Sequence, residues 1–252
     1  MKFIKIIFLT AFLILPAVSA LSSSIPLTEE TGQKMLKELQ SIRQLLEKQQ
    51  KPEIPAPSVK AESQLVKVSL AGGASLGRAD APLVLIEYTD YQCPYCKKFY
   101  EGPFQEIKKN YIDTGKVRFI SRNLPLPFHN RAQKAAQAVY CAGEQGKYFQ
   151  MKEQLFTAKK GLEPVVFKDY ALEAGLNENK FLSCLDGEAS AAAINSEAKY
   201  AGTIGVTGTP SFILGLNSGK EMTGRKIVGG QPYANFSALF DELLKQTTAE
   251  PK

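Results

Sequence analysis

The sequence predicts an α/β domain in which a sheet is covered by helices, and three features of the chain predict it. A short apolar run at Leu83–Tyr88 has the length and composition of a buried strand, and a helical segment follows it directly. A second strand pattern, at Lys116–Ser121, leads into a long block of helical segments, and two further strand patterns follow that block. The expected order is a β-α-β half and a β-β-α half separated by helices, which is typical of a sheet packed against helices.

The first twenty residues have the pattern of a cleaved secretory signal. Lys2 and Lys5 precede an apolar run at Ile6–Leu15, and small uncharged side chains lead up to Ala20. The run is shorter than a permanent bilayer span requires, and an uncleaved membrane anchor is the alternative. No cysteine directly follows Ala20 to carry a lipid. We expect residues 1–20 to be removed after Ala20, and the remaining chain to be exported to a bacterial periplasm.

The charge of the exported chain is mild. The formal net charge of +6 falls to +4 when the two lysines of the leader are removed. The sequence contains no dense cluster of Lys and Arg and no basic stripe interleaved with aromatic residues, which are the marks of nucleic-acid-binding proteins. We therefore expect no nucleic-acid partner, and we also expect no cofactor and no bound metal.

Residues 21–51 are predicted to form an N-terminal oligomerisation helix. Apolar side chains recur at 4-3-4 spacing, at Met35, Leu39, Ile42 and Leu46, which is the spacing of a coiled-coil seam. An isolated helix of this length with one apolar face needs a partner. The seam covers only about two heptads, so two arrangements stay open. The helix pairs with the same helix of another subunit, with a dimer favoured over a trimer, or it packs on its own domain or frays.

The proline-spaced stretch at 52–65 predicts an extended, semi-rigid linker, and residues 66–252 are the predicted globular domain. Within that domain we expect strands at 83–88, 116–121, 206–214 and 226–228. We expect helices at 94–111, interrupted at Pro103, and at 132–142, 147–156, 165–174, 179–184, 191–204 and 232–246.

The chemistry is predicted to lie in the segment Tyr91-Gln-Cys93-Pro-Tyr-Cys96. Cys93 follows the first strand, and Pro94 suits the first position of a helix, where no backbone N–H is needed. The sulfur of Cys93 is then at a helix N-terminus, where N–H groups and the helix dipole stabilise a thiolate and lower its pKa. Cys96 is three residues further on, near enough to form a disulfide with Cys93 and to resolve a mixed disulfide.

Two other interpretations of this cysteine pair are less favoured by the sequence. A C-x-x-C can be half of a zinc site, but Cys141 and Cys184 are far apart in the sequence and form no second knuckle. A purely structural Cys93–Cys96 bridge closes a small ring, which removes little entropy from the unfolded chain. Redox chemistry is therefore the favoured interpretation.

The CPYC motif after an apolar strand, the long helical block and Gly208-Thr209-Pro210 before a later strand together resemble the DsbA-like branch of the thioredoxin superfamily. The resemblance covers about residues 66–248. It implies a thioredoxin fold with a helical insertion at about 125–205. It also implies that Pro210 is cis and lies against the active-site cysteines, and that the backbone of Thr209 binds the substrate chain.

The same resemblance assigns roles to other residues. Pro94 and Tyr95, between the two cysteines, are expected to contact substrate. Related proteins often pair cysteines in the helical block, which makes a structural Cys141–Cys184 disulfide the first expectation and two buried free thiols the second. Tyr95 replaces the histidine of the strongly oxidising members and cannot supply its positive charge. We therefore expect a weaker thiolate and a less oxidising couple, which favours isomerase activity.

Glu87 is a charged residue inside an otherwise apolar strand. If it is buried, its carboxyl has a raised pKa and can relay the proton of the Cys96 thiol, and the resemblance places an acid at the matching position. The alternative is a solvent-facing residue on an edge strand. Asp90 is expected to do no more than end the strand, and Tyr91 and Tyr95 are candidates for an apolar groove that binds unfolded chains.

His129, the single histidine, is expected to be a cap or packing residue. Three functions follow from these features: a dithiol oxidase, a disulfide isomerase and a non-redox binding module. The expected function is a mixed oxidase/isomerase, because DsbA-like enzymes with an added N-terminal helix combine or interchange the two roles. Its expected partners are unfolded or misoxidised exported proteins and a membrane or periplasmic redox partner.

Overall fold

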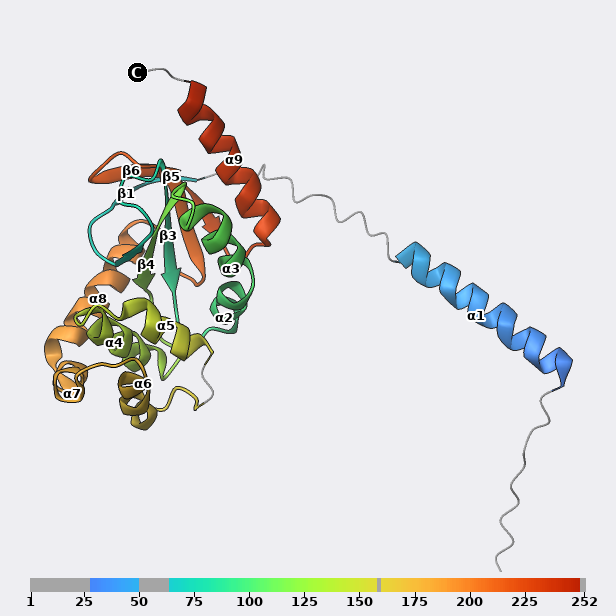
Figure 1. The fold of residues 1–252 in the computed structure, drawn as a ribbon, viewed down its shortest axis with the longest axis horizontal. Helices are drawn as coiled ribbons and strands as arrows, with labels where there is room; N and C mark the ends of the chain where they lie inside the picture. Colours follow the sequence, from blue (N-terminus) through green and yellow to red (C-terminus); the bar gives the residue numbers. More distant parts are fainter. Residues whose placement is uncertain (1–27, 50–63, 158–159, 250–252) are drawn as a thin grey trace, which may run out of the picture. The chain divides into compact units, whose positions relative to one another are not determined.

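The computed structural model describes residues 28–49, 64–157 and 160–249, and the chain divides into two compact units, at 1–58 and 59–252 (Figure 1). The described part of the first unit is one helix, α1 (Glu29–Gln49). The second unit contains the sheet. The predicted signal peptide and nearly all of the predicted linker lie outside the described residues. The first strand, β1, begins at Leu65, the last residue assigned to that linker.

A sheet of six strands forms the centre of the second unit, in the order β1-β6-β5-β3-β4-β2 within the described residues. β3 and β4 are parallel, and the other neighbouring strands are antiparallel. The strands are β1 (Leu65–Ser69), β2 (Ala74–Leu76), β3 (Leu83–Thr89), β4 (Val117–Asn123), β5 (Ser211–Leu216) and β6 (Glu221–Val228). Every residue of β3 is buried, which explains why its sequence is a continuous apolar run with a single charge.

The helices follow the predicted pattern closely. They are α2 (Pro94–Glu101), α3 (Pro103–Ile107), α4 (Ala132–Gly143), α5 (Tyr148–Phe156), α6 (Phe167–Glu173), α7 (Glu178–Asp186), α8 (Glu188–Thr203) and α9 (Tyr233–Ala249), with a π-helical turn at Lys108–Ile112 and a 3-10 turn at Pro164–Val166. In Figure 1, α4 to α8 gather at the end of the sheet toward which β3 runs. The predicted fold class, a thioredoxin fold with a helical insertion, is confirmed.

The two faces of β3 pack into two different cores. Leu83 and Leu85 belong to a large cluster that also contains the CxxC cysteines and residues of α3, α4, α5, α6, α7 and α9. Val84 and Ile86 belong to a second cluster, which includes residues of α8. Because side chains alternate along a strand, Glu87 shares the face of Leu85 and lies on the side of the sheet that carries the cysteines.

Two expected strands begin at other residues, and two strands are additional. β5 begins at Ser211 rather than at 206, because Pro210 has no N–H to donate to a neighbouring strand. β6 begins at Glu221, five residues before the predicted strand. β1 and β2 have no predicted counterparts. These segments are short or rich in polar and glycine residues, and their pairing with neighbouring strands makes them extended.

Helix α1 carries a stripe of exposed apolar side chains. Met35, Leu36, Leu39, Ile42 and Leu45 are each between 50% and 62% exposed. The side chain of Leu46, the fourth position of the predicted seam, lies outside the described part of the chain. None of the described helices is long and apolar enough to cross a membrane.

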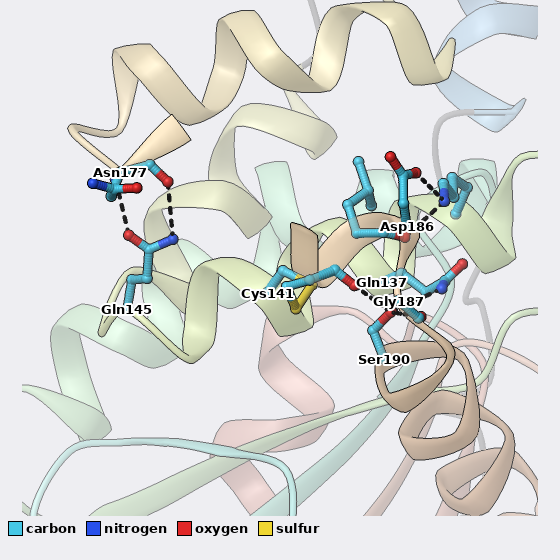
Figure 2. The surroundings of a disulfide bond; sticks show 10 residues. Gln137, Cys141, Gln145, Asn177, Asp186, Gly187 and Ser190 are labelled. Carbon is cyan, nitrogen blue, oxygen red and sulfur yellow. Dashed lines mark hydrogen bonds and ion pairs between the residues drawn. A yellow bond between two sulfur atoms is a disulfide. The ribbon is translucent and has the colours of Figure 1, made fainter. Parts of the chain in front are cut away.

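Cys141 on α4 and Cys184 on α7 form a disulfide (Figure 2). Of the two sequence expectations for these cysteines, the structure contains the first. Figure 2 also shows side-chain hydrogen bonds on both sides of the bridge. Gln145, just after α4, accepts from the backbone N–H of Asn177, the N-cap of α7, at 2.9 Å and donates to its carbonyl. On the other side, Gln137 of α4 donates to Ser190 Oγ of α8 at 3.0 Å.

Removing this disulfide is expected to destabilise the domain without preventing folding. The bridge joins residues 43 apart, and a loop of that length predicts a loss of about 4 kcal/mol in the free energy of unfolding. The measurement is denaturant unfolding of Cys141→Ala/Cys184→Ala against the unmodified oxidised protein. The control, Cys93→Ala/Cys96→Ala, removes a much smaller ring and should change stability less. A loss below about 1 kcal/mol in the first variant would contradict the expectation.

Candidate active site

The two candidate active-site cysteines lie at the helix start that the sequence predicts for them. Cys93 is the N-cap of α2, Pro94 occupies the first turn, and Cys96 lies one turn into the helix. Both cysteines are buried free thiols. The turn is fixed by two backbone hydrogen bonds, from the Cys93 N–H to the Asp90 carbonyl at 3.2 Å and from the Lys97 N–H to the Cys93 carbonyl at 3.1 Å.

The two thiols have opposite acidities. Hydrogen bonding from the Cys96 thiol, supported by the backbone N–H groups of Cys96 and Tyr95, lowers the pKa of Cys93 to about 5 against the opposing effect of burial. Burial raises the pKa of Cys96, and the neighbouring Cys93 sulfur raises it further. At neutral pH, Cys93 is therefore a thiolate and Cys96 a protonated thiol. A thiolate at the helix N-terminus with a neutral partner one turn away is the arrangement that thiol–disulfide exchange requires.

The loop before β5 closes over this cysteine pair. The Thr209–Pro210 peptide bond is cis, as the resemblance implies. The carbonyl oxygen of Thr209 is 3.4 Å from the sulfur of Cys93. Gly230 packs between this loop and α2. A Cβ added at Gly230 would lie 3.4 Å from the Tyr95 carbonyl oxygen and 3.6 Å from Pro210 Cγ, so the three segments are in close contact. The backbone of Thr209 is thus next to the candidate nucleophile, and Tyr95, between the two cysteines, is 67% exposed.

Glu87 is buried on the central strand, so the edge-strand alternative is wrong. Its Oε2 forms an ion pair with Lys152 Nζ from α5 and accepts from Ser121 Oγ at 3.0 Å. Lys152 also donates to Ser121 Oγ at 2.7 Å. Sequence reasoning missed Lys152, although a signal was present. Lys152 precedes Leu155 and Phe156 by three and four residues, which places its charge on the apolar face of α5.

Asp90 does more than end the strand, which corrects the expectation for it. The side chain is buried, and its Oδ1 accepts from the Gln92 N–H at 2.7 Å. Oδ2 accepts from the Leu126 N–H at 2.8 Å and lies 2.8 Å from His129 Nδ1. Asp90 therefore attaches the loop before α4 to the turn that carries Cys93, and His129 is a packing residue of that attachment.

Tyr91 is not part of an exposed groove. It is 3% exposed, its ring packs on Phe156 at 5.1 Å between centroids, and its hydroxyl donates to Tyr148 at 3.4 Å. Of the two tyrosines expected to line a groove, only Tyr95 is exposed. Within the described residues, no group of three His, Cys, Asp or Glu side chains could hold a metal ion. Among these residues, no further ligands stand beside Cys93 and Cys96 to complete a zinc site.

Comparison with known proteins agrees with this fold. A family model described as thioredoxin matches residues 69–241. The crystal structure of α-DsbA1 from Wolbachia pipientis is 28% identical, with a TM-score of 0.63, over 71% of this chain and 94% of that one. The catalytic domain of ScsC from Proteus mirabilis is 25% identical, with a TM-score of 0.55, over 68% and 88%. A ScsC variant with a linker deletion is 26% identical, with a TM-score of 0.55, over 68% and 74%.

The chain also matches part of a much longer protein, an antiporter. The Na(+)/H(+) antiporter NhaA 3 of Salinispora tropica is 32% identical over 139 residues, which are 55% of this chain but 21% of that protein. The matched region is therefore about a fifth of the antiporter's length.

Together, the sheet order, the cysteine pair at the start of α2 and the cis proline opposite it define a protein of the thioredoxin-fold class with a dithiol site. The chain belongs to the thioredoxin family and is a DsbA-like member of that superfamily.

Proposed function

We propose that this protein is an exported thiol–disulfide oxidoreductase that both forms and rearranges disulfides in exported proteins. The observation that carries the proposal is the Cys93 thiolate at the start of α2, next to the protonated Cys96 and the carbonyl of Thr209. The matched structures α-DsbA1 and ScsC support the redox class. The basic and apolar leader at 1–20 supports export to a periplasm.

As an oxidase, the protein starts from a Cys93–Cys96 disulfide. A client thiolate attacks Cys93, the bond between the two cysteines breaks, and Cys96 leaves as a thiolate that takes up a proton. A second client thiolate then attacks the client sulfur of the mixed disulfide, and Cys93 leaves as a thiolate. The client is oxidised by two electrons and the cysteine pair is reduced. The low pKa of Cys93 makes it a good leaving group in the last step.

As an isomerase, the protein starts from the reduced pair. The Cys93 thiolate attacks a wrong disulfide of the client, and a client thiolate is released. That thiolate attacks another client disulfide, and a final attack on the mixed disulfide returns Cys93 as a thiolate. No net oxidation takes place. Thr209 and Pro210 are proposed to hold the client backbone during these steps, with Pro94 and the exposed Tyr95 beside them.

The N-terminal helix is proposed to add the isomerase role by self-association. The apolar stripe formed by Met35, Leu39 and Ile42 is exposed on α1, and with Leu46 it has the spacing of a coiled-coil seam. A dimer brings two catalytic domains to one client. ScsC has a catalytic domain and a linker, which supports the proposed division of this chain into a linker and a catalytic domain.

The test compares the chain from Leu21 with a truncation that begins at Pro57, which keeps all strands of the described domain. Both are assayed for reactivation of a scrambled multi-disulfide substrate and for oxidation of a reduced one. We expect both to oxidise, and only the longer chain to isomerise. A double variant in the longer chain, Leu39→Glu/Ile42→Glu, should be monomeric by light scattering and behave like the truncation.

If both forms oxidise equally and neither isomerises, the protein is a monomeric oxidase and the role assigned to α1 is wrong. If neither form changes the redox state of either substrate, the third function, a non-redox binding module, replaces the proposal.

A further inference from the structure

A continuous set of buried polar side chains leads away from Glu87. Lys152 Nζ pairs with Glu87 Oε2 and donates to Ser121 Oγ at 2.7 Å, and Ser121 Oγ donates to Glu87 at 3.0 Å. The Tyr148 hydroxyl is the next group, 3.4 Å from Ser121 Oγ. Glu87, Ser121 and Lys152 are fully buried, and such groups are costly to bury unless they are connected to one another.

The hydroxyl of Tyr148 is placed to pass a proton on. It lies within 3.5 Å of the Ser121 carbonyl, Ser121 Oγ and Asn123 Oδ1, so rotation about its C–O bond redirects one proton between alternative acceptors. Tyr91, two residues before Cys93, donates to the same hydroxyl at 3.4 Å. The tyrosine therefore lies between the buried ion pair, the active-site turn and the end of β4.

This set of residues ends at a surface pocket. The pocket has a volume of about 240 Å³, and Tyr148, Asn123 and Glu197 are among its lining residues. The backbone and side-chain N–H groups of Asn123 both donate to Glu197 Oε2 at 2.8 Å. They hold a carboxylate at the pocket, where Glu144 from the end of α4 also lines the wall. Burial raises the pKa of Glu197, while the Asn123 hydrogen bonds and the nearby Arg122 oppose that effect.

The inner end of the set lies on the side of the sheet that contains Cys96. Glu87 shares its face of β3 with Leu85, which packs in the same cluster as Cys96. The Nζ of Lys152 lies over the rings of Phe104 and Phe119, at 5.9 and 5.3 Å from their centroids, and both rings belong to that cluster. The other carboxylate oxygen, Glu87 Oε1, is buried and has no hydrogen-bond partner among the described residues, which leaves it available to a proton donor.

We propose that Lys152, Ser121 and Tyr148 extend the expected Glu87 relay into a path along which protons move between Cys96 and solvent, and that Glu197 exchanges them at the outer pocket. The inference rests on the proposed function, because only the redox cycle requires Cys96 to gain and lose a proton. When a client thiolate opens the Cys93–Cys96 disulfide, Cys96 leaves as a thiolate and receives, through Glu87, the proton that the Lys152 ammonium holds in the ion pair. Tyr148 and Ser121 then return a proton from the pocket to Lys152.

The test is the rate at which dithiothreitol reduces the oxidised Cys93–Cys96 pair in the full chain. Because the chain has no tryptophan, the reaction is followed by quenched flow with alkylation and mass analysis, in H₂O and D₂O. Tyr148→Phe should lower the rate by about ten-fold, a fraction of the 10²–10⁴ that positioned proton transfer contributes, and should raise the solvent isotope effect. Glu197→Gln should change both quantities in the same direction.

A path changes forward and reverse rates alike, so the equilibrium constant with glutathione and the pH midpoint of Cys93 alkylation should stay at their original values. The matched control is Tyr140→Phe, which removes a hydroxyl from the same pocket that has no hydrogen-bond partner among the described residues. It should leave the rate unchanged.

An unchanged rate in Tyr148→Phe overturns the inference, and so does a slower rate accompanied by a shifted equilibrium constant, which would indicate a structural role. If the unmodified protein fails to exchange disulfides with any dithiol, the proposed function itself is wrong.

Discussion

Replacing Cys93 with serine is expected to reduce disulfide exchange to the uncatalysed rate. A serine hydroxyl is neither ionised at neutral pH nor able to form a disulfide, so both the attacking group and the bond that is exchanged are lost. The measurement is oxidation of a reduced client protein, together with reactivation of a scrambled one. Residual activity well above background in Cys93→Ser would mean that another group carries the chemistry.

The matched control is Cys96→Ser, which keeps the nucleophile but removes the resolving thiol. It should accumulate mixed disulfides with clients, visible as covalent adducts on non-reducing gels. Alkylation of Cys93 in the reduced, unmodified protein should have a midpoint near pH 5 and be nearly constant above pH 7, because the thiolate fraction is then complete. A midpoint near the ordinary thiol value would show that α2 and Cys96 do not stabilise the thiolate.

Replacing Lys152 with methionine is expected to cost about 3–5 kcal/mol of the free energy of unfolding. The substitution keeps most of the side chain's volume but leaves the Glu87 carboxylate buried without its cation, among the aromatic rings of the core. The measurement is chemical denaturation at pH 7. A loss below about 1 kcal/mol would mean that Glu87 is neutralised or hydrated in another way.

Two companion variants make this result specific. Lys152→Met combined with Glu87→Leu removes both charges, and it should recover much of the lost stability because no buried charge is left unpaired. Lys108→Met removes an exposed ion pair with Asp113, and it should change the free energy of unfolding by less than about 1 kcal/mol. If the double variant is less stable than Lys152→Met alone, the penalty does not come from the unpaired carboxylate.

Much of the site was predictable because it depends on local chemistry. The CPYC motif after an apolar strand, with proline at the first helical position, places Cys93 at a helix N-terminus wherever that helix packs. Glu87 could be identified as a candidate because a charge inside an apolar strand is conspicuous in the sequence. Its actual partner was harder to find, because Lys152 is 65 residues away and on a different helix.

The assignments that failed depended on distant contacts. The sequence indicated only that Asp90 ends the strand. Its partners Leu126 and His129 are more than thirty residues away in the chain, and only the fold brings their loop near Asp90. Tyr91 was expected to line a groove because the sequence does not show that it is buried. Its ring is covered by Phe156 of α5, which is distant in the chain. β2 was missed because three residues carry too little pattern, and only β4 makes them a strand.

By itself, the sequence determined the fold class, the order of the central elements and the candidate nucleophile. These follow from hydrophobic periodicity and from residues within one helical turn of each other, which act over a few residues of chain. The tertiary structure decided the burial that raises the pKa of Cys96, the Glu87–Lys152 ion pair and the polar contacts that lead to the outer pocket. Each of these depends on residues of separate elements, which come together only after the chain has folded.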